Sequence, residues 1–282
     1  MINLGINNIA NMEKLNEGHN LYINLTDGRN MKKVLLIQKT FVAQKLIINQ
    51  RGALNPEKKR SHKNIIFSEI NQRKKVLTKN LIPGNTVYGE HTITINKFEY
   101  RVWDPFRSKL AAAIVNGLSV DILSNLKSVL YLGVSTGTTA SHVSDIIDES
   151  GILFGIEISA RSARDFLENV ANVRKNIIPE VADSRHPDLY TSVFQKVDMV
   201  YCDIAQPDQT RIAIENCNSF LKNSGYLFLV IKAHSIDVLK NPKDVFAEEA
   251  KKITNNNFII EYQINLEPFD KAHSMVIAIK IN

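Results

Sequence analysis

Residues 128–139 read SVLYLGVSTGTT, and the order of residue types in this stretch decides the fold. Val129 to Leu132 form an apolar run with the length of a buried strand. Gly133 and Gly137 follow in a tight turn, and a helical sequence, TTASHVSDIID, begins at Thr138. A strand, a glycine turn and a helix in this order are typical of a parallel β-α-β unit.

The same alternation continues on both sides of this stretch. Helices are predicted at 107–118, 138–148, 159–173, 210–222 and 241–254, and strands at 128–133, 152–158, 176–181, 197–204, 225–233, 258–266 and 274–281. This pattern predicts an α/β fold with a mostly parallel seven-stranded sheet and helices on both faces. No helix separates the last two strands, so at least one of them is expected to run antiparallel.

The chain before Asp104 has a different character. Residues 64–103 contain short β-type runs, and the alternation Thr92-Ile93-Thr94-Ile95 is typical of a half-buried antiparallel strand. Residues 1–30 contain eight Asn without periodicity, and we expect them to be poorly ordered. Residues 31–50 fit a helix or a hairpin. We therefore divide the chain into a basic, Asn-rich extension (1–56), a small N-terminal antiparallel β domain (57–105) and an α/β domain (106–282).

Composition and charge narrow the function classes. With 44% hydrophobic and 23% charged residues, the chain is neither collagen-like nor wholly disordered. Two cysteines cannot form a disulfide framework, and we expect no secretory signal and no transmembrane segment. Residues 1–80 hold 15 Lys and Arg against 5 Asp and Glu, whereas residues 81–282 hold 20 against 24. A basic N-terminal part on a slightly acidic body suggests a polyanionic partner, most simply nucleic acid.

Four ligand-like features stand at four successive strand ends. They are the turn at Gly133 and Gly137, Glu157 after the second strand, Asp183 after the third, and Asp203 after the fourth. A carboxylate after the second strand is placed to hold a ribose diol. Each acid taken alone is more often a helix cap or a turn residue than a ligand contact. Together they predict a nucleoside-like ligand lying across the carboxyl edge of the sheet.

A second set of residues is charged where apolar strands end or begin. Lys232 follows the strand GYLFLVI, Lys109 begins a helix, and His273 precedes the last strand. If the fourth and fifth strands are neighbours, Asp203 and Lys232 meet at their ends. The alternatives are a snorkelling lysine and a surface histidine. Cys202 and Cys217 fit core thiols, and no metal site is predicted because the histidines lack ligand spacing.

Seven strings carry a family resemblance: KNLIPGNTVYGE (79–90), EYRVWDPFRSKLAAAI (99–114), VLYLGVSTGTTASHVSDI (129–146), NIIPEVADSRHP (176–187), DIAQPDQTRI (203–212), IKAHSID (231–237) and LEPFDKAHSMVI (266–277). They resemble the fibrillarin family, the methyltransferases of box C/D ribonucleoproteins, continuously from about residue 60. The resemblance implies a Rossmann-like methyltransferase fold that uses S-adenosylmethionine. It also implies 2′-O-methylation of ribosomal RNA directed by a box C/D guide RNA.

The resemblance carries over residue by residue. It implies cofactor contacts at Gly133, Thr138, Thr139, Glu157, Ile158, Asp183, Ser184, Asp203, Ile204, Ala205 and Gln206. It implies a catalytic set of Lys109, Asp203, Lys232 and His273. The implied partners are guide RNA, the rRNA substrate, a Nop-family scaffold and a kink-turn-binding protein. A eukaryotic source would imply the nucleolus.

The sequence departs from the family pattern in two places, and three other functions remain as alternatives. Residues 1–60 contain only four Gly and three Arg, so they do not have the composition of the Gly/Arg-rich tail of eukaryotic members. Val134 and Ser184 stand where the family commonly has Ala, and both changes are small. The alternatives are methylation of a protein (histone) glutamine, a mainly structural ribonucleoprotein role, and a nicotinamide-dependent oxidoreductase.

Overall fold

The computed structural model describes residues 62–70 and 72–281. The predictions of a poorly ordered start over residues 1–30, and of a helix or hairpin over residues 31–50, lie outside the described residues. No helix within the described ranges is long and apolar enough to cross a membrane.

A four-stranded antiparallel sheet comes first in the described chain. Its strands are β1 (Ile65–Ile70), β2 (Arg73–Lys79), β3 (Thr92–Ile95) and β4 (Phe98–Trp103), in the order β1-β2-β4-β3. The small antiparallel sheet predicted from the β-type runs is therefore present. One of these β-type runs, NTVYGEHTITI (85–95), is a strand only at its end, over Thr92–Ile95, and residues 85–90 form a loop. The carboxylate of Glu90 accepts the backbone N–H groups of Val87 and Tyr88, and this turns the chain back on itself.

The second sheet has seven strands in the order β10-β11-β9-β8-β5-β6-β7. The strands are β5 (Ser128–Leu132), β6 (Ile152–Glu157), β7 (Ile177–Val181), β8 (Val197–Cys202), β9 (Leu221–Lys232), β10 (Phe258–Asn265) and β11 (His273–Lys280). Of these, β11 pairs antiparallel with both β9 and β10, and the other pairings are parallel. The predicted fold class, including the reversed strand near the end, is confirmed.

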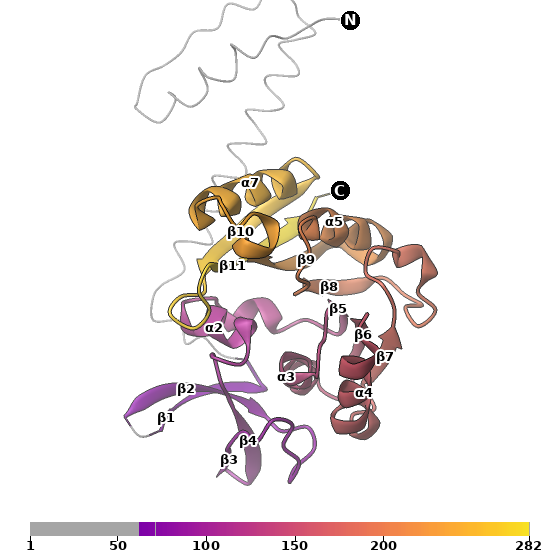
Figure 1. The fold of residues 1–282 in the computed structure, drawn as a ribbon. Helices are drawn as coiled ribbons and strands as arrows, with labels where there is room; N and C mark the ends of the chain where they lie inside the picture. Colours follow the sequence, from indigo (N-terminus) through magenta and orange to yellow (C-terminus); the bar gives the residue numbers. More distant parts are fainter. Residues whose placement is uncertain (1–61, 71, 282) are drawn as a thin grey trace, which may run out of the picture. The chain divides into compact units, whose positions relative to one another are not determined.

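Helices cover both faces of this sheet. Figure 1 shows α3 (Thr138–Ile147) and α4 (Ala160–Asn169) on one face, with α5 (Gln209–Phe220) and α7 (Pro242–Thr254) on the other. The shorter helices are α2 (Lys109–Val115), α6 (Ala233–Ile236) and the 3-10 turns Val120–Leu123, Ala171–Val173 and Pro187–Leu189. Helix α2 is shorter than predicted. The Ser108 hydroxyl caps its start, and the chain leaves the helix at Asn116 before Gly117, whose φ is +115°.

Alternate residues of the central strands enter two separate cores. Val129 and Tyr131 of β5 pack with α2 and α3, whereas Leu130 and Leu132 pack on the α5 and α7 side. This period of two on a strand buried from both faces explains the near-continuous apolar runs in the sequence. Cys202 and Cys217 are buried free thiols in the second core, as predicted, and burial raises the pKa of Cys202 to about 12.

Buried charges join the small sheet to helix α3. Asp145 on α3 accepts hydrogen bonds from Arg101 of β4 at 2.8 Å and from Arg174 at 2.6 Å. Beside it, His142 Nδ1 lies 2.7 Å from the Thr78 hydroxyl, and its Nε2 lies 2.8 Å from the Tyr88 hydroxyl. Burial and the two guanidinium groups hold the pKa of His142 well below its ordinary value of 6.5. The imidazole is therefore neutral in the folded protein.

The neutral His142 predicts a loss of stability in acid. Below about pH 6.5 the unfolded chain protonates this histidine and the folded chain does not, so the free energy of unfolding falls as the pH falls. For this single group the expected loss is about 1.4 kcal/mol in total between pH 7.5 and pH 5.5. Urea unfolding at the two pH values measures this loss, and His142→Gln should remove that part of it. Equal losses in the two proteins would contradict the prediction.

Candidate active site at the carboxyl edge of the sheet

Two lysines meet at Asp203, one of them, Lys232, because strands β8 and β9 are neighbours. Asp203 follows β8 and Lys232 ends the neighbouring strand β9. Lys232 Nζ lies 2.8 Å from Asp203 Oδ1 and donates to the Asp203 carbonyl oxygen, also at 2.8 Å. Lys109, the first residue of α2, donates to Asp203 Oδ2 at 3.2 Å. One carboxylate therefore fixes two ammonium groups that come from distant parts of the chain.

His273 joins this cluster through a residue that the sequence reasoning missed. It stands opposite Lys232 in the β9–β11 register, and its Nδ1 lies 2.9 Å from Asp270 Oδ1. Asp270 Oδ2 in turn lies 3.8 Å from Lys109 Nζ. The only signal in the sequence was an acid three residues before His273. Asp270 belongs to the loop between β10 and β11, so this single spacing is not part of any helix or strand pattern.

The cluster is partly buried and its proton positions follow from its neighbours. The side chains of Asp203, Lys232 and Lys109 are 12%, 15% and 24% exposed. His273 Nδ1 also lies 2.7 Å from the Lys271 carbonyl oxygen, so both of its contacts are acceptors. Nδ1 therefore carries the proton, and Nε2 of the neutral ring is the acceptor. We call Lys109, Asp203, Lys232, Asp270 and His273 the Lys–Asp cluster.

The glycine turn lies directly beside Asp203. Gly133 has φ +77°, and a Cβ there would stand 3.1 Å from the Asp203 carbonyl oxygen. Gly137 has φ +92°, and its Cβ would stand 2.5 Å from the Phe166 ring. Both positions therefore require glycine. The turn delivers the N-terminus of α3, with Thr138 as its first residue, to the carboxyl edge of the sheet, where free backbone N–H groups can receive a ligand.

Thr139 and Glu157 flank this turn. The Thr139 hydroxyl donates to Ser108 at 2.9 Å, which ties the turn to the cap of α2 beside Lys109. Glu157 ends β6, and its two oxygens accept the backbone N–H groups of Ser135 at 2.8 Å and Ser159 at 2.9 Å. Each oxygen keeps a further lone pair, so this fixed carboxylate can accept two hydroxyls of a ribose. The next residue, Ile158, is 59% exposed.

The remaining predicted contacts lie at the ends of β7 and β8. The Asp183 carboxylate is held by Arg185, whose hydrogen bonds lower the pKa of Asp183. Ser184 is buried, and its carbonyl oxygen accepts from Asn216. After β8, Ile204 is half-buried, and Ala205 and Gln206 are exposed. The Asp203 N–H donates to the Leu132 carbonyl oxygen at 3.0 Å, which joins this segment to the glycine turn.

All these residues surround the point where the strand order reverses. Strand β5 lies between β6 and β8, so the chain winds outward from β5 in both directions, and ligands bind at such a switch point. Among residues 62–70 and 72–281, no group of three or more His, Cys, Asp or Glu side chains is placed to hold a metal ion.

Comparisons with known proteins identify the family of this chain. The fibrillarin family model matches residues 56–282. A Saccharolobus islandicus protein named fibrillarin-like rRNA/tRNA 2′-O-methyltransferase is 49% identical over 222 residues, which are 78% of this chain and 95% of the relative. Aeropyrum pernix fibrillarin, solved with natively bound S-adenosyl-L-methionine, is 40% identical with a TM-score of 0.71, over 77% of this chain and 94% of that one.

A third relative was solved as part of an assembly. The fibrillarin of a fibrillarin/Nop5p complex is 34% identical with a TM-score of 0.67, over 78% of this chain and 99% of that one. The match to the family model extends over both sheets and reaches the Lys–Asp cluster as well as the glycine turn. The chain that places these residues together is therefore a member of the fibrillarin family.

Proposed function

We propose that this chain transfers the methyl group of S-adenosylmethionine to the ribose 2′-oxygen of ribosomal RNA. The observation that carries the proposal is the meeting of Lys109, Asp203 and Lys232 beside the glycine turn at the switch point of the sheet. The names of the relatives support the reaction and the substrate class, and the Aeropyrum pernix structure supports the cofactor.

The donor set at the carboxyl edge fits S-adenosylmethionine. Glu157 is a buried carboxylate with lone pairs to spare for ribose hydroxyls, and the N-terminus of α3 presents backbone N–H groups. When bound, the cofactor supplies an electrophilic methyl group on a good leaving group. The residues that would hold it are Gly133, Thr138, Thr139, Glu157, Ile158, Asp183, Ser184, Asp203, Ile204, Ala205 and Gln206.

The Lys–Asp cluster provides orientation and a proton acceptor. Alignment of the 2′-hydroxyl with the methyl group can lower the barrier by about 7–11 kcal/mol in favourable cases. Lys232 is the residue that would orient this hydroxyl, or take its proton after losing one of its own, because its Nζ is held at 2.8 Å from Asp203 Oδ1 and at 2.8 Å from the Asp203 carbonyl oxygen. Asp203 fixes both lysines, while Asp270, itself held by His273, contacts Lys109 from the other side.

The RNA site to be methylated would be selected by partner molecules rather than by this chain. Residues 81–282 carry four more acidic than basic residues, so this part of the chain is a weak RNA binder by net charge alone. A Nop-family scaffold, for which the fibrillarin/Nop5p complex is the precedent, would present the RNA together with a box C/D guide RNA and a kink-turn-binding protein. In a eukaryotic cell this assembly would belong to the nucleolus. We further propose residues 1–56, 57–105 and 106–282 as extension, β domain and catalytic domain.

Two measurements test the proposal. Calorimetry of the full chain should show binding of S-adenosylmethionine and none of NAD. The chain reconstituted with guide RNA and the two partner proteins should methylate the guided ribose, and a substrate with a 2′-deoxy target should accept no methyl group. Label transferred to a histone glutamine and not to RNA, or assembly without any methyl transfer, would favour the alternatives over ribose methylation.

A further inference from the structure

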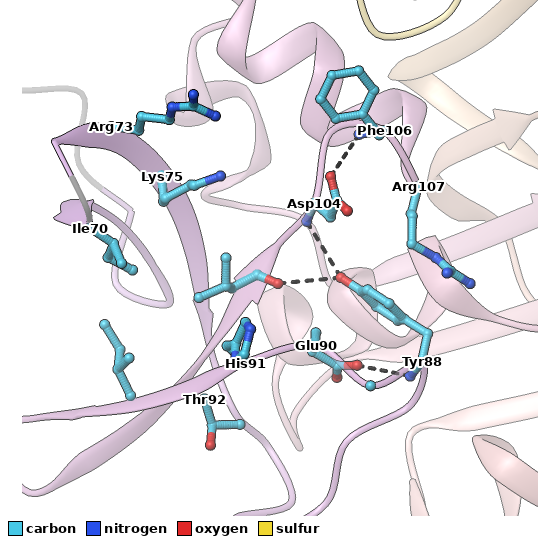
Figure 2. Close-up of a pocket in the computed structure, with 13 residues that line it drawn as sticks. Ile70, Arg73, Lys75, Tyr88, Glu90, His91, Thr92, Asp104, Phe106 and Arg107 are labelled. Atoms are coloured by element: carbon cyan, nitrogen blue, oxygen red, sulfur yellow. Dashed lines mark hydrogen bonds between the residues drawn. The ribbon is translucent and has the colours of Figure 1, made fainter.

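The small sheet carries a groove of about 970 Å³ that the proposed reaction does not use. Figure 2 shows Arg73 and Lys75 of β2 along one side and Phe106 and Arg107 along the other. Tyr88 and His91 form part of its floor and rim. We call this the basic groove.

The basic groove holds three permanent cations. Arg73 and Lys75 are two residues apart on a strand, so both side chains project from the same face. The Arg107 guanidinium lies 5.2 Å above the Tyr88 ring, a cation–π contact that positions the group and leaves its N–H edges available. None of the three forms an ion pair with a carboxylate among the described residues.

The acidic side chains of the groove are already engaged. Glu90 is buried and pairs with Arg101 at 2.6 Å. Asp104 accepts the backbone N–H of Phe106 at 2.9 Å. Asp104 is therefore the one acid of the groove lining whose charge is not matched by an ion pair within the described chain, against three cations, and the surface is cationic overall. A cationic surface of this kind favours a polyanion.

Phe106 connects the basic groove to the Lys–Asp cluster. Its ring is 70% exposed and packs edge-on against Phe269, with centroids 5.1 Å apart. Phe269 precedes Asp270, and Lys109 begins α2 two residues after Arg107. Phe106 and Arg107 therefore line the groove and are also close in the chain to Lys109, so an RNA strand bound in the groove would lie near the Lys–Asp cluster.

We propose that the basic groove binds the RNA substrate next to the target nucleotide. Arg73, Lys75 and Arg107 take its phosphates, and Phe106 stacks on a base or ribose at the entrance. Exposed aromatic rings beside cations are the usual platform for single-stranded RNA. The chain's own residues 1–58 are a poor occupant, because they carry eight Lys and Arg against four Asp and Glu. The inference rests on the proposed function.

Photo-crosslinking in the assembled guide complex tests the location. Substrate RNAs carry one 4-thiouridine at each position within six nucleotides of the target, and the crosslinked peptides are mapped. We expect crosslinks to residues 70–76 or 104–107 from one side of the target only. Crosslinks confined to other faces would overturn the inference, including the case in which a partner protein covers the groove.

Matched variants test the energetics. Lys75→Glu should raise the KM for guided RNA about tenfold and lower the salt slope of RNA binding by about 1. Lys74→Glu makes the same charge change on the opposite face of β2, where Lys74 lies over the Phe67 ring, and should stay near wild type. Phe106→Ala should weaken RNA binding by about 5- to 150-fold. Equal KM values for the two lysine variants would overturn the inference.

The two proposals can fail separately. If the wild-type complex transfers no methyl group, the proposed function is wrong, while the crosslinks still show whether RNA lies in the groove. If the wild-type complex methylates RNA and the groove variants keep their KM and salt slope, only the groove assignment is wrong.

Discussion

Lys232→Met should lower the rate of methyl transfer in the reconstituted complex by about 10²–10⁴-fold, the range for losing a positioned acid or base. Methionine keeps the length of the apolar stem, so the neighbouring strand β11 keeps its packing. The Asp203 carboxylate retains Lys109 as a partner at 3.2 Å, which limits the electrostatic damage. The loss should appear in kcat, with the affinity for S-adenosylmethionine changed by less than about threefold, because Lys232 is proposed to act on the 2′-hydroxyl.

A matched control lies at the other end of the same strand. Lys222 of β9 pairs with Asp198 at 2.7 Å, and its side chain is 48% exposed. Lys222→Met therefore removes a paired lysine from β9 without touching the Lys–Asp cluster, and its kcat should stay within about twofold of wild type. Normal transfer by Lys232→Met with normal cofactor binding would remove this residue from the mechanism.

The sequence predicted those parts of the site that depend on strand ends. Asp203 and Lys232 could be placed together because apolar runs locate strand ends reliably, and parallel strands bring their carboxyl ends to one edge. Glu157 followed from the same logic at β6. These predictions needed only the order of elements and the neighbour relation of two strands.

Residues placed by loops and by contacts between the sheets could not be predicted in this way. Asp270 reaches Lys109 through the loop between β10 and β11, which contains no periodic pattern. In the sequence, Arg101 has the pattern of a polar residue on the solvent face of a β-strand. It is fully buried, because Glu90 from a loop and Asp145 from a helix form ion pairs with it. The basic groove depends on how the loop before α2 lies against β2. Such contacts follow from three-dimensional packing rather than from local sequence.

Asp145→Asn should destabilise the described chain strongly and leave the Lys–Asp cluster intact. The Asp145 carboxylate is fully buried, and it accepts from Arg101, Arg174, the Thr78 hydroxyl and the Leu81 N–H at 2.6–3.0 Å. Removing its charge leaves two buried guanidinium groups, of which only Arg101 keeps an ion pair among the described residues, with Glu90 at 2.6 Å. Breaking a buried pair from one side costs about 3–5 kcal/mol.

The measurement is the thermal midpoint of unfolding of the full chain. A loss of that size should lower Tm by roughly 6–20 °C for a domain of this length. Glu149→Gln removes one negative charge from an exposed position just after α3 and should change Tm by less than about 2 °C, since surface changes are usually worth under about 0.5 kcal/mol. Equal thermal midpoints for the two variants would show that the Asp145 carboxylate does not stabilise the buried Arg101 and Arg174.

The same substitution should also affect the glycine turn, where the cofactor is proposed to bind. Arg101 donates to the Ser141 hydroxyl at 2.8 Å, and that hydroxyl donates to the carbonyl oxygen of Thr138, the first residue of α3. An Arg101 that has lost Asp145 can shift away from Ser141 and loosen this turn. We therefore expect weaker binding of S-adenosylmethionine by Asp145→Asn at temperatures well below its Tm, measured by calorimetry on the folded protein. Unchanged affinity there would confine the role of the buried charges to holding the small sheet against α3.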